Sequence, residues 1–395
     1  MKKYNIPFSP PDITEKEIEK VVEVLKSGWI TSGPKVAEFE KKVAEYCECE
    51  KAVAVSSATC ALDLILRVLN FNPPYEIITT PYTYASTSNT ICHRGIKPKF
   101  VDLEKDSFLI DINKIKDAIT PNTKAIVTVD IAGIPLDYDA IRNLLKELHR
   151  EDIVLISDSS HAFGATYKGR RVGCQADFHV FSFHAVKNLT TAEGGAITFN
   201  NNHFNGKKDL YKELKYTSLN GQTKDALTKS KAGGWQYDIL TDGLKCNMTD
   251  IHAAIGLVQL TRYEDMLKKR AALTDLYDEA LKDKSWAIIP FKKDSEKETS
   301  YHLFPLRIKN FTEKQRNDVI NILAEIGIPT NVHFTPLPMF TYYKNLGYSI
   351  KDYPNTYDQY KNELTLPLYS SLSFEDAKSV VAEVIKAVEQ VIKTA

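Results

Sequence analysis

Between residues 52 and 183 the sequence alternates short apolar runs with segments that are long enough to form helices. The helix-length segments include Ala61 to Leu69 and Ala140 to His149. The apolar runs are Ala52 to Val55, Glu76 to Thr79, Pro98 to Val101, Ala125 to Val129, Ile153 to Ile156 and His179 to Phe183. Strands that alternate with helices form a largely parallel sheet with helices on both faces. The sequence therefore predicts an α/β fold with a mostly parallel central sheet.

The length of the chain favours two domains, because 395 residues exceed the usual size of one hydrophobic core. Asn247 and the residues after it open a long apolar helix, and we place the domain boundary inside that helical region. A large domain is predicted over residues 1–260 and a smaller C-terminal α+β domain over residues 261–395. The elements expected in the smaller domain are a strand at Leu303 to Ile308, a helix from about Glu313 to Ile326 and a final helix capped at Ser373.

Three other segments carry local signals. A first helix is predicted over residues 13–26, where Thr14 and Glu17 match a capping box. The stretch Gly28 to Pro34 is either a packed turn or a segment that reaches toward a ligand. Residues 200–245 are polar and are predicted to be rich in loops, with one short helix. The first helix also carries an apolar stripe of Ile18, Val21, Val22 and Leu25, with Ile13 and Ile18 placed as a hydrophobic staple.

Charge and apolar patterning exclude several classes of protein. Lys and Arg number 51, Asp and Glu also number 51, and no basic block stands out, so the electrostatic footprint of a nucleic-acid-binding protein is missing. The start of the chain lacks the apolar core of a signal peptide, and no stretch approaches the ~20 apolar residues of a membrane span. A cytoplasmic protein without membrane contact is the simplest interpretation.

The six cysteines are scattered without a CxxC motif or a cluster of Cys and His. This pattern predicts neither a disulfide framework nor a zinc or other metal site. We interpret the cysteines as reduced and structural.

Lys187 is the residue best suited to covalent chemistry. It lies in the stretch FSFHAVKNLTTAEGGA, from Phe181 to Ala196, where a predicted strand ends and a polar turn precedes two glycines. Ligands in α/β folds usually bind at such loops beside the sheet. A desolvated lysine loses its proton readily and can attack a carbonyl to form a Schiff base, most commonly with pyridoxal phosphate. The alternative is an ordinary solvated loop lysine.

Such a cofactor needs an acid at its ring nitrogen, a cradle for its phosphate and a flat group over its ring. Asp158 directly follows a buried apolar run, where it could meet the ring nitrogen or cap a helix. Small hydroxyl residues from Ser56 to Leu62 lead into a helix, and they could cradle an anion or only cap that helix. Tyr84 lies at the end of the second run and could stack on the ring or pack in the core.

Taken together, these segments resemble the DegT/DnrJ-type nucleotide-sugar aminotransferases, a branch of the fold-type I pyridoxal phosphate enzymes. The resemblance covers nearly the whole chain and rests on the shared order and spacing of its motifs. The matching stretches are GWITSGPKVAEFE, AVSSATCAL, PYTYAST, VDIAGIPLDYDAI, SDSSHAFGA, FSFHAVKNLTTAEGGA, NMTDIHAAIGLVQL, GIPTNVHFTPL and LTLPLYSSL.

The resemblance implies a role for each candidate residue. Lys187 would form the Schiff base with pyridoxal 5'-phosphate and shuttle protons, while Asp158 would pair with the pyridine nitrogen. His161 would lie near the phenolic oxygen, and Tyr84 would stack on the ring. Asn247 matches an asparagine that reaches the phosphate from the neighbouring subunit, which implies a homodimer with shared active sites. The phosphate cradle would consist of Ala58, Thr59 and Ser182, and the sugar pocket would include Trp29, Thr31 and His333.

The resemblance also implies the reaction. An amino donor, glutamate, would leave its nitrogen on the cofactor, and a nucleotide-linked keto sugar would collect it, for surface polysaccharide or glycan biosynthesis. The motifs look most like those of members that act on UDP-linked 4-keto sugars, which favours C4 over C3 of a 3-keto sugar. Members that remove a sugar hydroxyl carry histidine at the position of Lys187, so a dehydratase is a weaker alternative. A non-catalytic binding protein with this fold, and a purely structural His333, remain alternatives as well.

Overall fold

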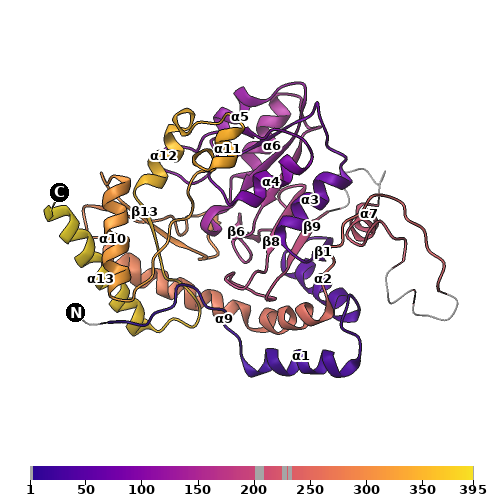
Figure 1. The fold of residues 1–395 in the computed structure, drawn as a ribbon, viewed down its shortest axis with the longest axis horizontal. Coiled ribbons are helices and arrows are strands. Elements are labelled where there is room, and N and C mark those ends of the chain that lie inside the picture. The colour runs from indigo at the N-terminus through magenta and orange to yellow at the C-terminus, as the bar shows by residue number, and fades with distance from the viewer. Residues whose placement is uncertain (1–2, 201–208, 225–228, 230–233, 395) are drawn as a thin grey trace.

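A computed structural model describes residues 3–200, 209–224, 229 and 234–394 (Figure 1). Within the segment 200–245, the described part holds the predicted short helix, α7 (Leu210–Thr217), followed by turns and isolated bridges. The other residues of that loop-rich segment lie outside the described part of the chain.

A seven-stranded sheet forms the centre of the larger part of the molecule (Figure 1). Its strands are β1 (Lys51–Val55), β2 (Glu76–Thr79), β3 (Lys99–Phe100), β4 (Thr123–Val129), β5 (Val154–Asp158), β8 (Phe178–Ser182) and β9 (Gly195–Phe199). The spatial order is β1-β9-β8-β5-β4-β2-β3. The strands from β8 to β3 run parallel, whereas β9 lies antiparallel between β1 and β8. The predicted α/β fold with a mostly parallel sheet is confirmed.

Alternate residues of the strands pack on opposite faces of this sheet. Ala52 and Ala54 of β1 belong to one buried cluster, and Val53 and Val55 belong to another. Strands of a parallel sheet are covered on both faces, which explains why they read as continuous apolar runs. The first cluster includes side chains of α2 (Pro34–Tyr46), α5 (Ile112–Ala118), α6 (Tyr138–Glu147) and α9 (Asp250–Leu281). The second cluster includes side chains of α3 (Ala58–Val68), α4 (Ala85–His93) and α7.

The C-terminal part has its own small antiparallel sheet of β10 (Ala287–Ile288), β12 (Phe304–Ile308) and β13 (Glu363–Leu366). The helices α10 (Glu313–Glu325) and α13 (Phe374–Thr394) pack on it in one buried cluster. The strand and both helices predicted for this part are confirmed. The shorter elements are β6 (Thr166–Tyr167), β7 (Arg170–Arg171), β11 (Lys297–Glu298), α11 (Thr341–Asn345), α12 (Pro354–Lys361) and the 3₁₀ turns Ile131–Gly133, Leu337–Met339 and Ile350–Asp352.

The helix α9 runs without a break through the predicted domain boundary at residue 260. Its first half, up to Leu267, packs under the central sheet, and its residues from Leu273 onward pack in the C-terminal cluster. The helix thus contributes to both cores. The division into residues 1–260 and 261–395 stays a prediction.

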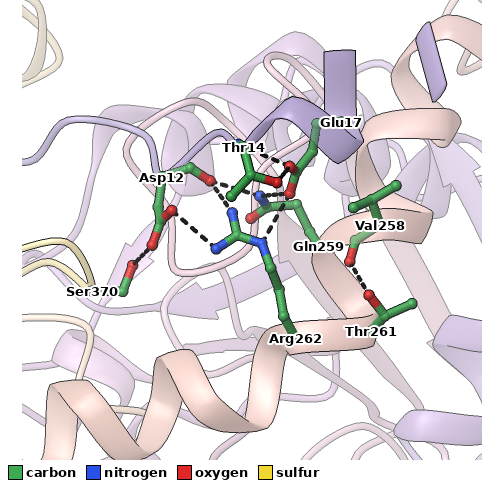
Figure 2. A network of polar contacts seen from close by, with 8 residues as sticks. All are labelled: Asp12, Thr14, Glu17, Val258, Gln259, Thr261, Arg262 and Ser370. Atoms are coloured by element: carbon green, nitrogen blue, oxygen red, sulfur yellow. Dashed lines mark hydrogen bonds and ion pairs between the residues drawn. The ribbon is translucent and has the colours of Figure 1, made fainter. Parts of the chain in front are cut away.

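The N-terminal segment is held against α9 by a network of polar contacts (Figure 2). Arg262 donates from Nη1 to Asp12 Oδ1 at 2.9 Å, and Asp12 Oδ2 accepts from Ser370 Oγ at 2.7 Å. Upstream of this anchor, the backbone N–H of Tyr4 donates to Ile326 O at 2.8 Å. The segment therefore crosses from the C-terminal part to the start of the first helix.

The first helix, α1 (Glu15–Ser27), begins with the predicted capping box, in which Thr14 N donates to Glu17 Oε2 at 2.9 Å. Its apolar stripe, however, faces outward: Ile18 is 49% exposed and Leu25 is 52% exposed. Ile13, the other member of the predicted staple, is exposed as well. An apolar helix face in such a position is typical of a surface that another protein covers. In the described ranges, no helix combines the length and the apolar character needed to cross a membrane.

Candidate functional site

A cavity of about 540 Å³ opens at the carboxyl ends of the parallel strands. Asp158 ends β5 and Ser182 ends β8, and both line the cavity. The carboxyl ends of parallel strands meet at one edge of the sheet, so residues far apart in the sequence converge there. The predicted site residues that line the cavity are Ala58, Thr59, Tyr84, Asp158, His161, Ser182, Lys187 and His333.

Lys187 reaches the cavity from the loop between β8 and β9. Backbone hydrogen bonds close this loop, from Phe183 N to Gly194 O and from Thr191 N to Phe183 O, both at 2.9 Å. Burial lowers the pKa of Lys187 to about 8, and the nearby Asp158 carboxylate opposes that shift. The unprotonated amine, which is the nucleophilic form, is therefore accessible near neutral pH.

The carboxylate of Asp158 is buried and accepts hydrogen bonds from neutral donors. Thr87 Oγ1 donates to Oδ2 at 2.7 Å, and Ser160 N donates to Oδ1 at 3.2 Å. The residues that follow Asp158 form turns and not a helix, so the aspartate does not act as a helix N-cap. A buried carboxylate beside a cavity is suited to a cationic or N–H-bearing ligand.

His161 is a neutral ring whose tautomer is fixed. The N–H of Ala132 donates to His161 Nδ1 at 3.2 Å, so Nδ1 is the acceptor and the ring proton lies on Nε2. Burial, helped by the positive charge of Lys187, holds the pKa of His161 well below its usual value. Ala132 adopts a positive φ of 58° in a tight turn that follows β4. His161 therefore offers a neutral Nε2–H donor to the cavity.

The N-terminus of α3 forms one wall of the cavity. Ser57 caps the helix by accepting from Cys60 N at 3.1 Å, while the first N–H groups of a helix, here those of Ala58 and Thr59, have no partner within it. Gly195 of β9 passes so close that a Cβ atom there would lie 2.6 Å from Ala58 N. A side chain at position 195 would therefore obstruct this wall, and glycine keeps it open to an anion.

Tyr84 is 65% exposed, so it does not pack in the core. It precedes α4, and its ring lies 6.1 Å from that of Phe334 at a tilt of 53°. The buried tyrosine of this stretch is Tyr82, whose hydroxyl donates to His333 O at 2.7 Å. The ring of Tyr84 is therefore free to cover a ligand in the cavity.

Phe8, His302 and Phe334 also line the cavity and were not anticipated from the sequence. The ring of Phe8 stacks on that of His333 with centroids 5.9 Å apart, and the His302 ring lies 4.3 Å from that of His161. Phe8 and His302 stand at positions without a local signal, one before the first helix and one before β12. Phe334 lies in the stretch GIPTNVHFTPL, so the family resemblance was its one available signal.

Trp29, Thr31 and Asn247 are not among the residues that line the cavity. Trp29 Nε1 donates to Ser32 O at 3.1 Å, and Asn247 Nδ2 donates to Ser32 Oγ at 2.7 Å. Thr31 O accepts from Asp250 N at 3.0 Å. The stretch from residue 28 to 34 is thus a packed turn against the start of α9 within this chain.

The residues of the cavity fit pyridoxal 5'-phosphate. The unobstructed helix N-terminus suits the phosphate, and the buried carboxylate suits a protonated ring nitrogen. The His161 Nε2–H can donate to the phenolic oxygen. The amine of Lys187, with its lowered pKa, suits the aldehyde.

Comparison with known proteins places the chain in a family. Residues 11–385 match the model of the DegT/DnrJ/EryC1/StrS aminotransferase family. The chain is 39% identical over 397 residues to the spore coat polysaccharide biosynthesis protein SpsC of Bacillus subtilis, with 99% of this chain and 98% of SpsC covered.

Solved structures agree with that match. A putative sugar aminotransferase from Streptococcus pneumoniae in its PMP-form has a TM-score of 0.94 and 45% identity, covering 98% of this chain and 100% of that one. Its PLP-form has a TM-score of 0.92 and 43% identity, with the same coverage. Helicobacter pylori PseC, an aminotransferase involved in the biosynthesis of pseudoaminic acid, has a TM-score of 0.89 and 29% identity, covering 98% and 100%. The chain therefore belongs to the DegT/DnrJ/EryC1/StrS aminotransferase family, whose cofactor is pyridoxal 5'-phosphate.

Proposed function

We propose that the protein transfers an amino group from glutamate to C4 of a nucleotide-linked 4-keto sugar, in the biosynthesis of a surface polysaccharide or glycan. The observation that carries the proposal is the meeting of Lys187, Asp158 and His161 in one cavity. The descriptions of similar proteins support the substrate class, since SpsC is a polysaccharide biosynthesis protein and the streptococcal relative a putative sugar aminotransferase.

When bound, pyridoxal phosphate supplies an aldehyde for the amino group and a ring that withdraws electrons from the reacting carbon. In this proposal Asp158 would keep the ring nitrogen protonated, and His161 would donate from Nε2 to the phenolic oxygen. Tyr84 covers the ring. The phosphate would be bound by Ala58, Thr59 and Ser182, which line the cavity beside the start of α3.

Lys187 acts as the base in both halves of the reaction. Its Nζ would accept the proton that leaves the carbon bearing the amino group and would later give that proton up, and the same transfers in reverse order would serve amination of the sugar. A pKa of about 8 suits this work, because the amine can gain and lose a proton near neutral pH. His333 lines the same cavity, and in this proposal it would contact the sugar.

A homodimer with shared active sites is part of the proposal. The outward apolar stripe of α1 supports it, together with an exposed group at Trp235, Tyr237, Ile239 and Leu240. Asn247 of the partner subunit would reach the phosphate. Trp29 and Thr31, which stand outside the cavity of their own chain, would approach the sugar pocket across the dimer.

The test is to incubate the purified protein with glutamate and a panel of UDP-, dTDP- and GDP-linked 3-keto and 4-keto sugars, and to detect products by mass. We expect a 4-amino sugar and 2-oxoglutarate. A 3-amino product would move the reaction to C3, and loss of water without gain of nitrogen would indicate a dehydratase. If no keto sugar accepts nitrogen while another carbonyl compound does, the proposed substrate class is wrong.

A further inference from the structure

His333 is held by a closed circuit of hydrogen bonds that passes through a buried carboxylate. Its Nδ1 lies 2.9 Å from Thr365 Oγ1, and Thr365 Oγ1 is hydrogen-bonded to Glu363 Oε1. The second carboxylate oxygen, Glu363 Oε2, accepts the backbone N–H of His333 at 2.9 Å. Glu363 and Thr365 both lie in β13 and are fully buried. The circuit is therefore closed to solvent on the side of the strand.

The protonation state of Glu363 fixes the direction of the side-chain hydrogen bonds in this circuit. The Thr365 hydroxyl has one proton, and Glu363 Oε2 must accept because an N–H points at it. When the carboxylate is ionised, Thr365 donates to it and can only accept from His333. The ring proton then lies on Nδ1, and Nε2 carries a lone pair.

A neutral carboxyl reverses the circuit. Its proton lies on Oε1, since Oε2 is already an acceptor, and is donated to Thr365 Oγ1. The Thr365 hydroxyl then donates to His333 Nδ1, and the ring proton lies on Nε2. One proton on Glu363 therefore changes which nitrogen of His333 is protonated.

The ring of His333 stays neutral in both arrangements. Burial lowers the pKa of His333 to about 4, and the positive charge of Lys187 adds to that effect. Nδ1 is taken by Thr365, whereas His333 lines the cavity, so Nε2 is the nitrogen left for a ligand. The ring can respond to Glu363 by changing tautomer, without gaining a charge.

We propose that Glu363 and Thr365 are positioning residues that set the tautomer of His333 and so decide whether it accepts from, or donates to, the sugar. With Glu363 ionised, Nε2 accepts from a sugar hydroxyl. With Glu363 neutral, Nε2–H donates to a hydroxyl or carbonyl oxygen of the sugar. This inference rests on the proposed function, because it takes His333 as a contact of the sugar.

The groups around Glu363 come from every element packed against it. Arg316 of α10 donates from Nη1 to Glu363 O at 3.0 Å, and Arg307 of β12 lies opposite Glu363 in the register of the small sheet. Tyr82 bonds to His333 O on the other side. Burial outweighs the hydrogen bonds of Thr365 and His333 and the charge of Arg316, and raises the pKa of Glu363 to about 8. The donating form of His333 therefore predominates at neutral pH.

Nitrogen-15 spectra of histidine-labelled, cofactor-loaded protein read the tautomer directly. We expect the His333 proton on Nε2 below the carboxyl pKa of about 8 and on Nδ1 above it. The His333→Gln variant assigns the signal. A His333 signal that keeps one tautomer on both sides of that pH would overturn the proposal.

Variants separate positioning from mere packing. In Glu363→Gln the amide can accept from His333 N and donate to Thr365, so we expect the Nε2–H tautomer at every pH. Thr365→Val breaks the circuit, and we expect KM for the sugar to rise about tenfold with a smaller change in kcat. Thr365→Ser keeps the hydroxyl and restores KM. The exposed Glu325→Gln serves as the matched control.

The outcomes distinguish this inference from the proposed function. The proposal would be contradicted if His333 in Glu363→Gln changed tautomer with pH as it does in the wild type. An unchanged KM for the sugar in Thr365→Val would contradict it as well. Should Glu363→Gln fail to fold, the Thr365 pair and the wild-type spectra still decide. The protein could change tautomer with pH as expected and yet aminate no keto sugar. That result would support the circuit of hydrogen bonds between the three residues and refute its role toward a sugar.

Discussion

Arg262 of α9 donates from Nε to Oε1 of Glu17 in α1 at 3.0 Å (Figure 2). Glu17 is only 1% exposed, so this is an ion pair to a buried carboxylate. Gln259 Nε2 donates to the same oxygen at 2.7 Å. Arg262 also reaches Asp12, so a single side chain ties α1 and the N-terminal segment to α9. Phe8, which precedes Asp12 in the sequence, lines the cavity. The contacts of Asp12 therefore help to hold a wall of the site in place.

Arg262→Met is expected to destabilise the protein by about 2–3 kcal/mol, because it removes the cation that is paired with the buried carboxylate of Glu17. Urea unfolding measures this, with the exposed Lys268→Met as a control that should stay within about 0.5 kcal/mol. Burial tends to raise the pKa of Glu17, but hydrogen bonds from Thr14, Gln259 and Arg262 hold it below its usual value. Its stabilising contribution is thus present above the ordinary pKa and is lost as pH falls through the lowered one. An Arg262→Met variant as stable as the wild type would contradict this role.

Lys187→Ala is expected to abolish transamination without unfolding the protein. Borohydride treatment of the cofactor-loaded wild type should label the peptide that contains position 187, and the exposed Lys378→Ala should behave as the wild type. A label at another lysine would refute the assignment.

The lowered pKa of Lys187 also predicts a stability effect in the cofactor-free protein. The folded state binds fewer protons than the unfolded state between about 8 and the ordinary value of 10.5, so stability should rise with pH across that interval. Lys187→Met should flatten this rise, which thermal unfolding at several pH values would detect. A wild type and variant with parallel profiles would argue against a buried amine.

His161→Leu is expected to slow the half-reaction with glutamate about tenfold to a hundredfold, because a neutral N–H donor to the cofactor is lost. His161→Gln keeps an N–H donor at this position and should retain more activity. Because the pKa of His161 lies well below its usual value, the rate should show no step from this residue near pH 6.5. Cofactor absorbance after mixing with glutamate follows the reaction, and equal rates in both variants would exclude the donor role.

The double variant Ile18→Glu, Leu25→Glu is expected to turn the proposed dimer into a monomer that retains cofactor poorly. The two side chains are exposed in the single chain, so charges there cost little unless a partner covers them. Sedimentation measures the mass, and Ile392→Glu on α13, where the isoleucine is also exposed, is the control. A wild type that sediments as a monomer would contradict the shared site.

The local pattern of apolar and capping residues in the sequence was sufficient to predict most of the strands and helices. The apolar runs appear as strands within a few residues of their predicted ends, because burial on both faces leaves a continuous apolar signal. The capping box of α1 is equally local. The pattern did not reveal that the stripe of α1 faces outward, since a helix presents the same periodicity to a core or to a partner.

The sequence by itself determined the chemistry that is available: a lysine on a loop after one strand, an aspartate ending another, and hydroxyl residues leading into a helix. These positions depend on neighbours in the chain. Only the tertiary structure decided that His161 Nδ1 accepts from Ala132, that Phe8 and His302 join the cavity, and that the backbone N–H of His333 donates to Glu363. Each of these depends on a hydrogen bond or a contact between residues far apart in the chain, and no local pattern carries that information.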